Sequence, residues 1–141
     1  MSPGILLQEG DWTRLGEAAA EIRRRVFVEE QQVPEEEEWD ALDAECLHFL
    51  ACREGTPLGT ARLLPDGHIG RVAVLAEARG LGIGVALMQA AIAAARARQH
   101  TEVVLSAQTH ALPFYARLGF IAEGDIYLDA DIPHRVMRLS L

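Results

Sequence analysis

The chain has 141 residues, of which 50% are hydrophobic and 24% are charged, and it carries a net charge of −8. This composition is typical of one globular domain over residues 1–141, and it excludes wholesale disorder. We expect a cytoplasmic protein with no membrane partner. The first residues lack the basic segment of a signal peptide, and no apolar run reaches the ~20 residues of a membrane span.

Acidic residues are concentrated in the first part of the chain. Residues 1–54 hold 14 Asp or Glu and 5 Arg, a balance of −9, whereas residues 55–141 hold 7 and 8, a balance of +1. A chain without a basic excess is a poor nucleic-acid binder, so we expect no such partner. The acidic part suits either a cationic substrate or a well-solvated surface. All 13 basic residues are Arg, which excludes Schiff-base catalysis and a P-loop lysine.

Helical patterns come first along the chain. Apolar spacing predicts a helix from about residue 11 or 13 to residue 25 and a second short helix over 26–33 that ends before Pro34. Residues 35–38 are predicted to form an acidic loop. Turn signals then separate three strands, at about 46–53, 57–64 and 68–75. Strands joined this closely predict an antiparallel meander.

The second half of the chain alternates helices and strands. The Ala-rich stretch 84–100 has the spacing of an amphipathic helix, and 102–107 is apolar enough for a strand buried on both faces. A short helix is predicted over 111–118, with Gly119 as its cap, followed by strands at 120–128 and 134–139. This order predicts a mixed α+β domain that contains one β-α-β crossover.

The two cysteines lie on one predicted strand. Along an extended chain, the Cα atoms of Cys46 and Cys52 lie ~20 Å apart, which is too far for a disulfide. His48 shares their face, but only adjacent members of the set can meet, so a metal site is not expected. Buried thiols in a reducing compartment are the predicted state.

Residues 79–84, with the sequence Arg-Gly-Leu-Gly-Ile-Gly, join a predicted strand to the Ala-rich helix. Glycines let the backbone approach a ligand, the helix start presents unpaired N–H groups, and Arg79 adds positive charge. The loop therefore predicts a phosphate site. Alternatively, the glycines only let the helix pack closely on the sheet. A dinucleotide fold is a poor fit, because three antiparallel strands precede the loop.

This loop matches the Gln/Arg-x-x-Gly-x-Gly/Ala signature of the GNAT acetyltransferases, and residues 108–120, Gln-Thr-His-Ala-Leu-Pro-Phe-Tyr-Ala-Arg-Leu-Gly-Phe, resemble that family's second conserved block. Residues 25–31, 68–74 and 132–134 are similar to its ElaA-like subgroup. The resemblance covers almost the whole chain from about residue 10. It implies a central, mostly antiparallel sheet of six to seven strands with a splayed parallel pair, flanked by about four helices.

The resemblance also implies an enzyme that moves the acetyl group of acetyl-CoA to a primary amine by direct attack in a ternary complex. The acceptor is then a small-molecule or peptide amine, and acetyl-CoA acts as a co-substrate without a metal. The implied cofactor-binding residues are Val72, Ala73, Val74, Arg79, Gly80, Leu81, Gly82, Ile83, Gly84 and Gln108. An acyl-CoA sensor without turnover is the alternative function. We also expect a homodimer, which would form through the final strands as exposed sheet edges.

Tyr115 matches the family's proton donor to the leaving thiolate, and its alternative role is that of a core aromatic beside Phe114. The general base stays open. Its candidates are Glu30, which is favoured by its place in the family-like stretch, and Glu29, His48 and His110. A further histidine, His134, follows Pro133 and is a candidate for a hydrogen bond within a turn.

Overall fold

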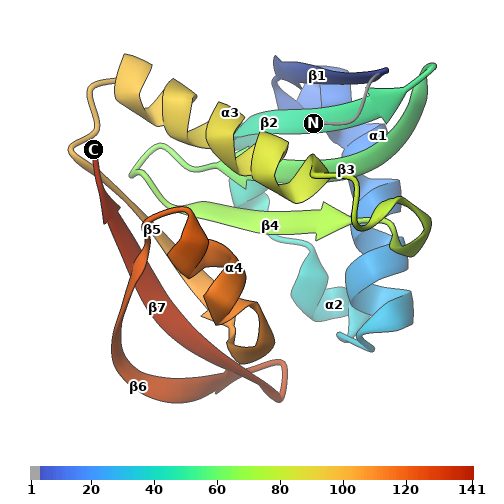
Figure 1. The fold of residues 1–141 in the computed structure, drawn as a ribbon. Coiled ribbons are helices and arrows are strands. Elements are labelled where there is room, and N and C mark those ends of the chain that lie inside the picture. Colours follow the sequence, from blue (N-terminus) through green and yellow to red (C-terminus); the bar gives the residue numbers. More distant parts are fainter. Residues whose placement is uncertain (1–3) are drawn as a thin grey trace.

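The structure, a computed structural model, describes residues 4–141 as a mixed α+β fold with two antiparallel sheets (Figure 1). The larger sheet has the order β1-β2-β3-β4 and the smaller has the order β5-β7-β6. This confirms the predicted class, although the strands divide between two sheets. The strands are β1 (Ile5–Gly10), β2 (Leu47–Arg53), β3 (Thr56–Leu63), β4 (Ile69–Val74), β5 (Glu102–Gln108), β6 (Ile121–Asp129) and β7 (Ile132–Ser140).

Three of the four α-helices correspond to predicted helices, and α2 is an addition. The α-helices are α1 (Trp12–Arg23), α2 (Glu35–Glu38), α3 (Ile83–Ala97) and α4 (Leu112–Arg117). The acidic stretch that we predicted as a loop is the single turn α2, which begins immediately after Pro34. Proline suits a helix start because its missing N–H is not needed there.

The first helix is longer than its α-helical part. After Arg23 the backbone continues as a π-helical segment, η1 (Arg24–Glu30), in which the Gln31 N–H donates to the Val26 carbonyl at 3.1 Å. The sequence analysis divided this stretch into two helices. No glycine or proline lies between Gly16 and Pro34, so the helical hydrogen bonding continues from α1 into η1 without a break.

Strand β1 was not predicted, because its six residues contain only a short apolar run, Ile5 to Leu7, without alternation. It pairs antiparallel with β2 along its full length, from Ile5 opposite Arg53 to Gly10 opposite His48. Ile5 is buried, whereas its neighbour Leu6 is 70% exposed. Pairing with β2 stabilises a segment whose own pattern is weak.

Helices α1 and α3 cover opposite faces of the larger sheet. A separate hydrophobic core lies on each face of the sheet. Alternate residues of β2 pack into one core or the other, because side chains along a strand point to opposite faces. Phe49 packs in the core that includes Leu87 and Met88 of α3, and Leu50 packs in the core that includes Leu15 and Ile22 of α1. The free cysteines are both buried, as predicted.

Among the described residues, the backbones of the two sheets are bridged at one end. A single parallel bridge joins His68, just before β4, to Val104 of β5. Beyond it, β4 and β5 belong to different sheets, and Figure 1 shows them separating toward α4. This is the splayed parallel pair that the sequence implied, and it opens the molecule between the sheets.

Candidate active site

The glycine-rich loop before α3 forms one wall of a groove of about 490 Å³. Gly80 and Gly82 have φ angles of 82° and 80°, a conformation that costs other residues strain. Gly82 is the N-cap of α3, and no side chain of the described residues caps this helix end. The first N–H groups of α3, reinforced by the helix dipole, are therefore available to an anion.

Seven of the ten predicted cofactor-binding residues line this groove: Val72, Val74, Arg79, Gly80, Gly82, Ile83 and Gly84. The Ala73 side chain points to the opposite face of β4 and packs in the α1 core, so only its backbone faces the groove side. Leu81 lies within the same loop. Gln108 lies elsewhere, in a second cavity.

Strand β4 carries a bulge beside the groove. Thr60 pairs with Ala73 and Arg62 pairs with Gly70, so Arg71 and Val72 have no ladder partner in the β3–β4 pairing. Arg71 also has a φ angle of 49°, which is unusual for a residue with a side chain. A bulge releases backbone groups from the ladder. The freed groups are suited to hydrogen-bond an extended, amide-bearing ligand along β4.

Arg79, at the head of the loop, is held by two contacts. Its Nη1 and Nη2 atoms lie 2.7 Å from the two carboxylate oxygens of Glu30, and its Nε donates to the Val74 carbonyl at 3.1 Å. The hydrogen bond from Arg79 lowers the pKa of Glu30. A carboxylate in this state is a weaker base than an unpaired one.

Tyr115 lies on α4, against Phe114 and Phe120. The ring centroids are 5.0 Å and 6.0 Å away, with interplanar angles of 81° and 72°, so both contacts are edge-to-face. Burial raises the pKa of the hydroxyl to about 12. The group therefore stays protonated at neutral pH and can donate a proton, but it cannot act as a base there.

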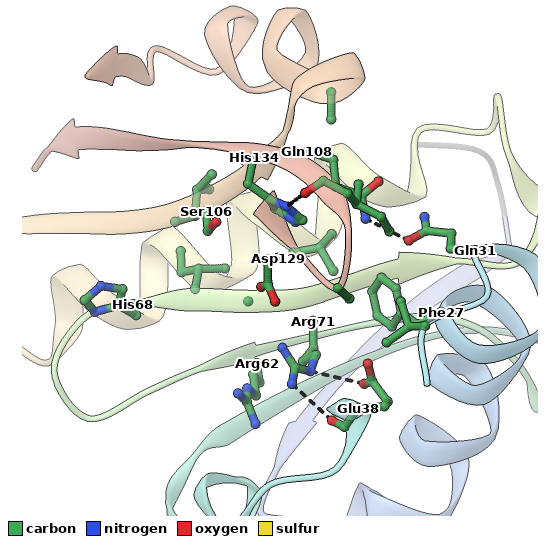
Figure 2. A pocket seen from close by; sticks show the side chains of 18 of the residues that line it. Phe27, Gln31, Glu38, Arg62, His68, Arg71, Ser106, Gln108, Asp129 and His134 are labelled. Atoms are coloured by element: carbon green, nitrogen blue, oxygen red, sulfur yellow. Dashed lines mark hydrogen bonds and ion pairs between the residues drawn. The ribbon is translucent and has the colours of Figure 1, made fainter. Parts of the chain in front are cut away.

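A second cavity, of about 480 Å³, is lined by residues of β4, β5 and the β6–β7 hairpin (Figure 2), and Tyr115 is among its lining residues. Val72 and Ala111 line both this cavity and the groove. The two spaces therefore meet at the β4 bulge and the start of α4. A ligand along β4 and a second ligand in this cavity would contact one another there.

The second cavity draws its polar side chains from both sheets. Gln108 Nε2 donates to Gln31 Oε1 at 2.7 Å, which links β5 to the residue after η1. Figure 2 shows these two amides at one side of the cavity, with Arg71 and Asp129 facing its middle. The residues come from most of the length of the chain, so no short motif describes them.

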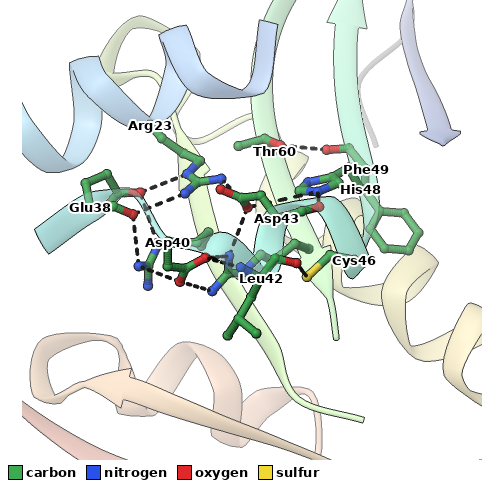
Figure 3. A network of polar contacts seen from close by, with 11 residues as sticks. Arg23, Glu38, Asp40, Leu42, Asp43, Cys46, His48, Phe49 and Thr60 are labelled. Carbon is green, nitrogen blue, oxygen red and sulfur yellow. Dashed lines mark hydrogen bonds and ion pairs between the residues drawn. The ribbon is translucent and has the colours of Figure 1, made fainter. Parts of the chain in front are cut away.

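A buried network of ion pairs (Figure 3) borders the second cavity, whose lining includes its members Glu38, Arg62 and Arg71. Arg23 donates to Glu38 and to Asp43, each at 2.8 Å, and Arg62 donates to Asp43 at 2.9 Å. Arg71 lies 3.1 Å from the same Glu38 carboxylate. Glu38 is only 3% exposed. The sequence analysis predicted an acidic loop over residues 35–38, and this was wrong for Glu38, because Arg23 and Arg71 neutralise its buried carboxylate.

The other candidate bases lie in different surroundings. His48 is 1% exposed, and its Nε2 lies 2.9 Å from the Asp43 carbonyl oxygen. Burial lowers its pKa, and it does not line either cavity, so it belongs to the structural network. His110 is exposed and lines the second cavity, whereas Glu29 is exposed on η1.

Several cavity residues were not singled out as site residues from the sequence. They are Ser106, Arg62, Arg71, Asp129 and His134. Two of them carried a signal: His134 lies in the stretch Ile132-Pro133-His134, and Arg71 lies in the family-like stretch 68–74. The expected hydrogen bond of His134 within a turn is present, between Nδ1 and the Ile132 carbonyl oxygen at 2.7 Å. Among residues 4–141, no group of three or more His, Cys, Asp or Glu is placed to hold a metal ion.

The sequence profile of a family described as "Acetyltransferase (GNAT) domain" matches residues 14–141. The chain belongs to the GNAT acetyltransferase family. It is 38% identical over 120 residues to YjcF of Bacillus subtilis, described as an uncharacterized N-acetyltransferase, and the match covers 82% of this chain and 86% of YjcF.

Solved structures of the family share this fold. An acyl-CoA N-acyltransferase from Pseudomonas aeruginosa is 39% identical, with a TM-score of 0.85 and coverage of 95% of this chain and 98% of that one. ElaA of Escherichia coli is 29% identical, with a TM-score of 0.84 and the same coverage. The resemblance to GNAT enzymes and to ElaA is therefore confirmed, and acyl transfer is the activity that the family supports.

Proposed function

We propose that this GNAT protein transfers an acetyl group from acetyl-CoA to a primary amine, by direct attack within a ternary complex. The observation that carries the proposal is the meeting of two cavities at Val72 and Ala111, with Tyr115 in the wall of one of them. Two substrates that occupy these two cavities then bring amine and thioester together where the cavities meet. No covalent acetyl-enzyme is needed.

The groove fits acetyl-CoA in two respects. The uncapped N-terminus of α3, with Gly80 and Gly82 before it, suits the pyrophosphate. A Cβ added at Gly80 would meet nothing within 4 Å, so this part of the loop is open to a ligand. The bulged backbone of Arg71 and Val72 suits the amides of the pantetheine arm. The predicted residues Leu81 and Gln108 remain part of the proposal, the first through its backbone and the second near the thioester.

Transfer of the acetyl group needs charge stabilisation and one proton. A backbone N–H of the β4 bulge is placed to stabilise the oxyanion that forms when the amine attacks the carbonyl. The departing thiolate then takes a proton from the hydroxyl of Tyr115, which is neutral because its pKa is raised to about 12.

Glu30, the favoured base from the sequence, is better placed for a different task. Both of its oxygens contact Arg79 at 2.7 Å, and its pKa is lowered by that pairing. We assign Glu30 to holding Arg79 at the head of the phosphate loop. The proton on the incoming amine then needs another acceptor.

In this proposal the second cavity binds the acceptor, and we call it the acceptor cavity. Its lining suits a small amine or a peptide amine without strong charge selection. Glu37 and Asp129 line it, but so does Arg71, and Glu38 is already paired with Arg23 and Arg71. A polycationic acceptor is therefore one member of the expected class and not its defining member. A neutral amine that hydrogen-bonds Gln31 and Gln108 fits equally well.

Two measurements test the proposal. Calorimetry with acetyl-CoA measures occupation of the groove, and release of free thiol measures turnover over polyamines, amino sugars, amino acids and peptide N-termini. We expect binding together with acetylation of at least one class. Binding without turnover on every amine would instead support the alternative function, an acyl-CoA sensor. Acetyl label that stays on the isolated protein would contradict direct attack.

We also propose a cytoplasmic homodimer. Strand β6 is the edge of the smaller sheet and exposes Ile121, Ile126 and Leu128 at 73%, 61% and 67%. An apolar edge strand favours pairing with a second copy. Within residues 4–141, no helix is long and apolar enough to cross a membrane. Light scattering coupled to size exclusion measures the mass, and Ile126→Lys should shift a dimer toward monomer.

A further inference from the structure

The stretch Ile132-Pro133-His134 has no role in the transfer as described so far. It begins β7, directly after a two-residue turn whose residues Ala130 and Asp131 have φ angles of 50° and 62°. Positive φ at both central positions is the geometry of a type I′ turn, which closes a hairpin tightly. Alanine adopts such an angle only under strain. The turn holds the start of β7 against the acceptor cavity, and His134 lines that cavity.

The hydrogen bond of His134 identifies its tautomer. Nδ1 lies 2.7 Å from the Ile132 carbonyl oxygen, and a carbonyl oxygen can only accept. Nδ1 must therefore carry the proton. In the neutral ring this leaves Nε2 with a free lone pair, which is the form that accepts a proton. Among the described residues, no hydrogen bond to Nε2 is present.

The His134 ring is also held in orientation. Tyr127 of β6 stacks on it, with ring centroids 6.0 Å apart and an interplanar angle of 25°. The Tyr127 hydroxyl is in turn hydrogen-bonded to the Ser106 hydroxyl of β5, which lines the same cavity. Three strands of the smaller sheet thus position one imidazole. Figure 2 shows it at the cavity wall near Asp129.

Other titratable groups face the same cavity but are less suited to take a proton from an amine. Asp66 lies 3.1 Å from His68, both at the exposed end of β4, and His110 is exposed at the cavity rim. The remaining charged groups are Glu37 and Glu38 of α2, Asp129 of β6, and Arg62 and Arg71 of the larger sheet. The carboxylates are intrinsically weaker bases than imidazole.

We propose that His134 is the general base of this site, acting through Nε2 on the ammonium form of the acceptor. This inference rests on the proposed amine acetylation. Nε2 takes one proton from the ammonium, and the amine nitrogen then forms a bond to the acetyl carbon. As the C–S bond breaks, the thiolate takes a proton from Tyr115. The second nitrogen proton restores Tyr115 through water, and the imidazolium releases its proton to solvent.

His134→Asn is the test variant. The asparagine amide can still donate to the Ile132 carbonyl and support the turn, but it has no group at the position of Nε2. We expect kcat to fall by about 10²–10⁴-fold, which is the usual contribution of general base catalysis. The affinity for acetyl-CoA should not change. His100→Asn, in a histidine outside both cavities, is the control for replacing a histidine.

The dependence on acceptor protonation separates a base from a structural role. The loss of kcat in His134→Asn should shrink as pH rises, because more acceptor arrives as the free amine. For the same reason, the loss should be large with ethylamine and should nearly vanish with the less basic 2,2,2-trifluoroethylamine. A variant that keeps wild-type kcat, or loses the same factor with both amines and at every pH, would overturn the inference while leaving acetylation intact. If the wild-type protein binds acetyl-CoA but acetylates no amine, this result contradicts the proposed function itself, independently of His134.

Discussion

The groove and the second cavity are built in opposite ways, although they meet at Val72 and Ala111. Most of the groove comes from one continuous stretch, residues 72–85, and it acts through backbone groups and a helix terminus. The cavity gathers side chains from η1, α2, β3, β4, β5, α4 and the β6–β7 hairpin. A ligand common to a whole family can be bound by a local backbone motif. A ligand that varies within the family needs side chains from many elements, which can change independently.

The largest expected effect falls on Tyr115, which lines the cavity and, in the proposed mechanism, protonates the thiolate of the ligand in the groove. Tyr115→Phe keeps both edge-to-face contacts and removes only the proton donor. We expect kcat to fall by about 10²–10⁴-fold, with the acetyl-CoA affinity unchanged in calorimetry. Since the pKa of Tyr115 is raised to about 12, its ionisation should not cause a decline in wild-type activity up to about pH 10. Unchanged turnover would reduce Tyr115 to a packing residue.

The next effect concerns the contribution of the buried ion-pair network to the stability of the protein. Asp43→Ala leaves Arg23 and Arg62 without one of their buried carboxylate partners. Breaking one side of a buried ion pair costs about 3–5 kcal/mol, so the free energy of unfolding in urea should fall by about that amount. Asp66→Ala, at an exposed pair with His68, is the matched control and should cost under about 1 kcal/mol. Equal losses in the two variants would show that the network contributes no more than a surface pair.

A smaller effect, on the affinity for acetyl-CoA, is expected from the glycine-rich loop of residues 79–84. Gly80→Val and Gly55→Val place the same side chain at φ angles of 82° and 80°, and an added Cβ meets nothing within 4 Å in either case. Backbone strain is therefore matched, but only Gly80 lines the groove. We expect acetyl-CoA to bind roughly tenfold more weakly to Gly80→Val alone, because the side chain blocks close backbone approach. Equal affinities would place the pyrophosphate elsewhere.

The smallest effect is expected from the exposed part of α2. Replacing Glu35, Glu36 and Glu37 with Gln should lower kcat/KM for a polycationic acceptor by less than about threefold at low salt. Glu38 is left unchanged in this variant because it is buried in ion pairs. The difference should disappear at high salt, where the Debye length is ~3 Å. A large loss that persists at high salt would indicate direct contact with the acceptor.

Sequence reasoning succeeded for elements with a strong local pattern. The Ala-rich helix α3, the apolar strand β5 and the meander of β2, β3 and β4 were all predicted with boundaries close to the observed ones. The weakly patterned strand β1 was missed, because pairing with β2 stabilises it more than its own residues do. The same reason explains α2, a single turn whose last residue, Glu38, is anchored by Arg23.

The sequence alone located the glycine-rich loop of residues 79–84 and Tyr115, because both belong to short motifs formed by neighbours along the chain. Only the tertiary structure decided which charges are free. Glu30 and Glu38 are both glutamates of one acidic stretch, yet Arg79 and Arg71, from distant segments, hold them in ion pairs. The tertiary structure also placed His134 beside Tyr127 and Ser106. Electrostatic and hydrogen-bonding partners are set by proximity in space, and a sequence pattern does not contain that proximity.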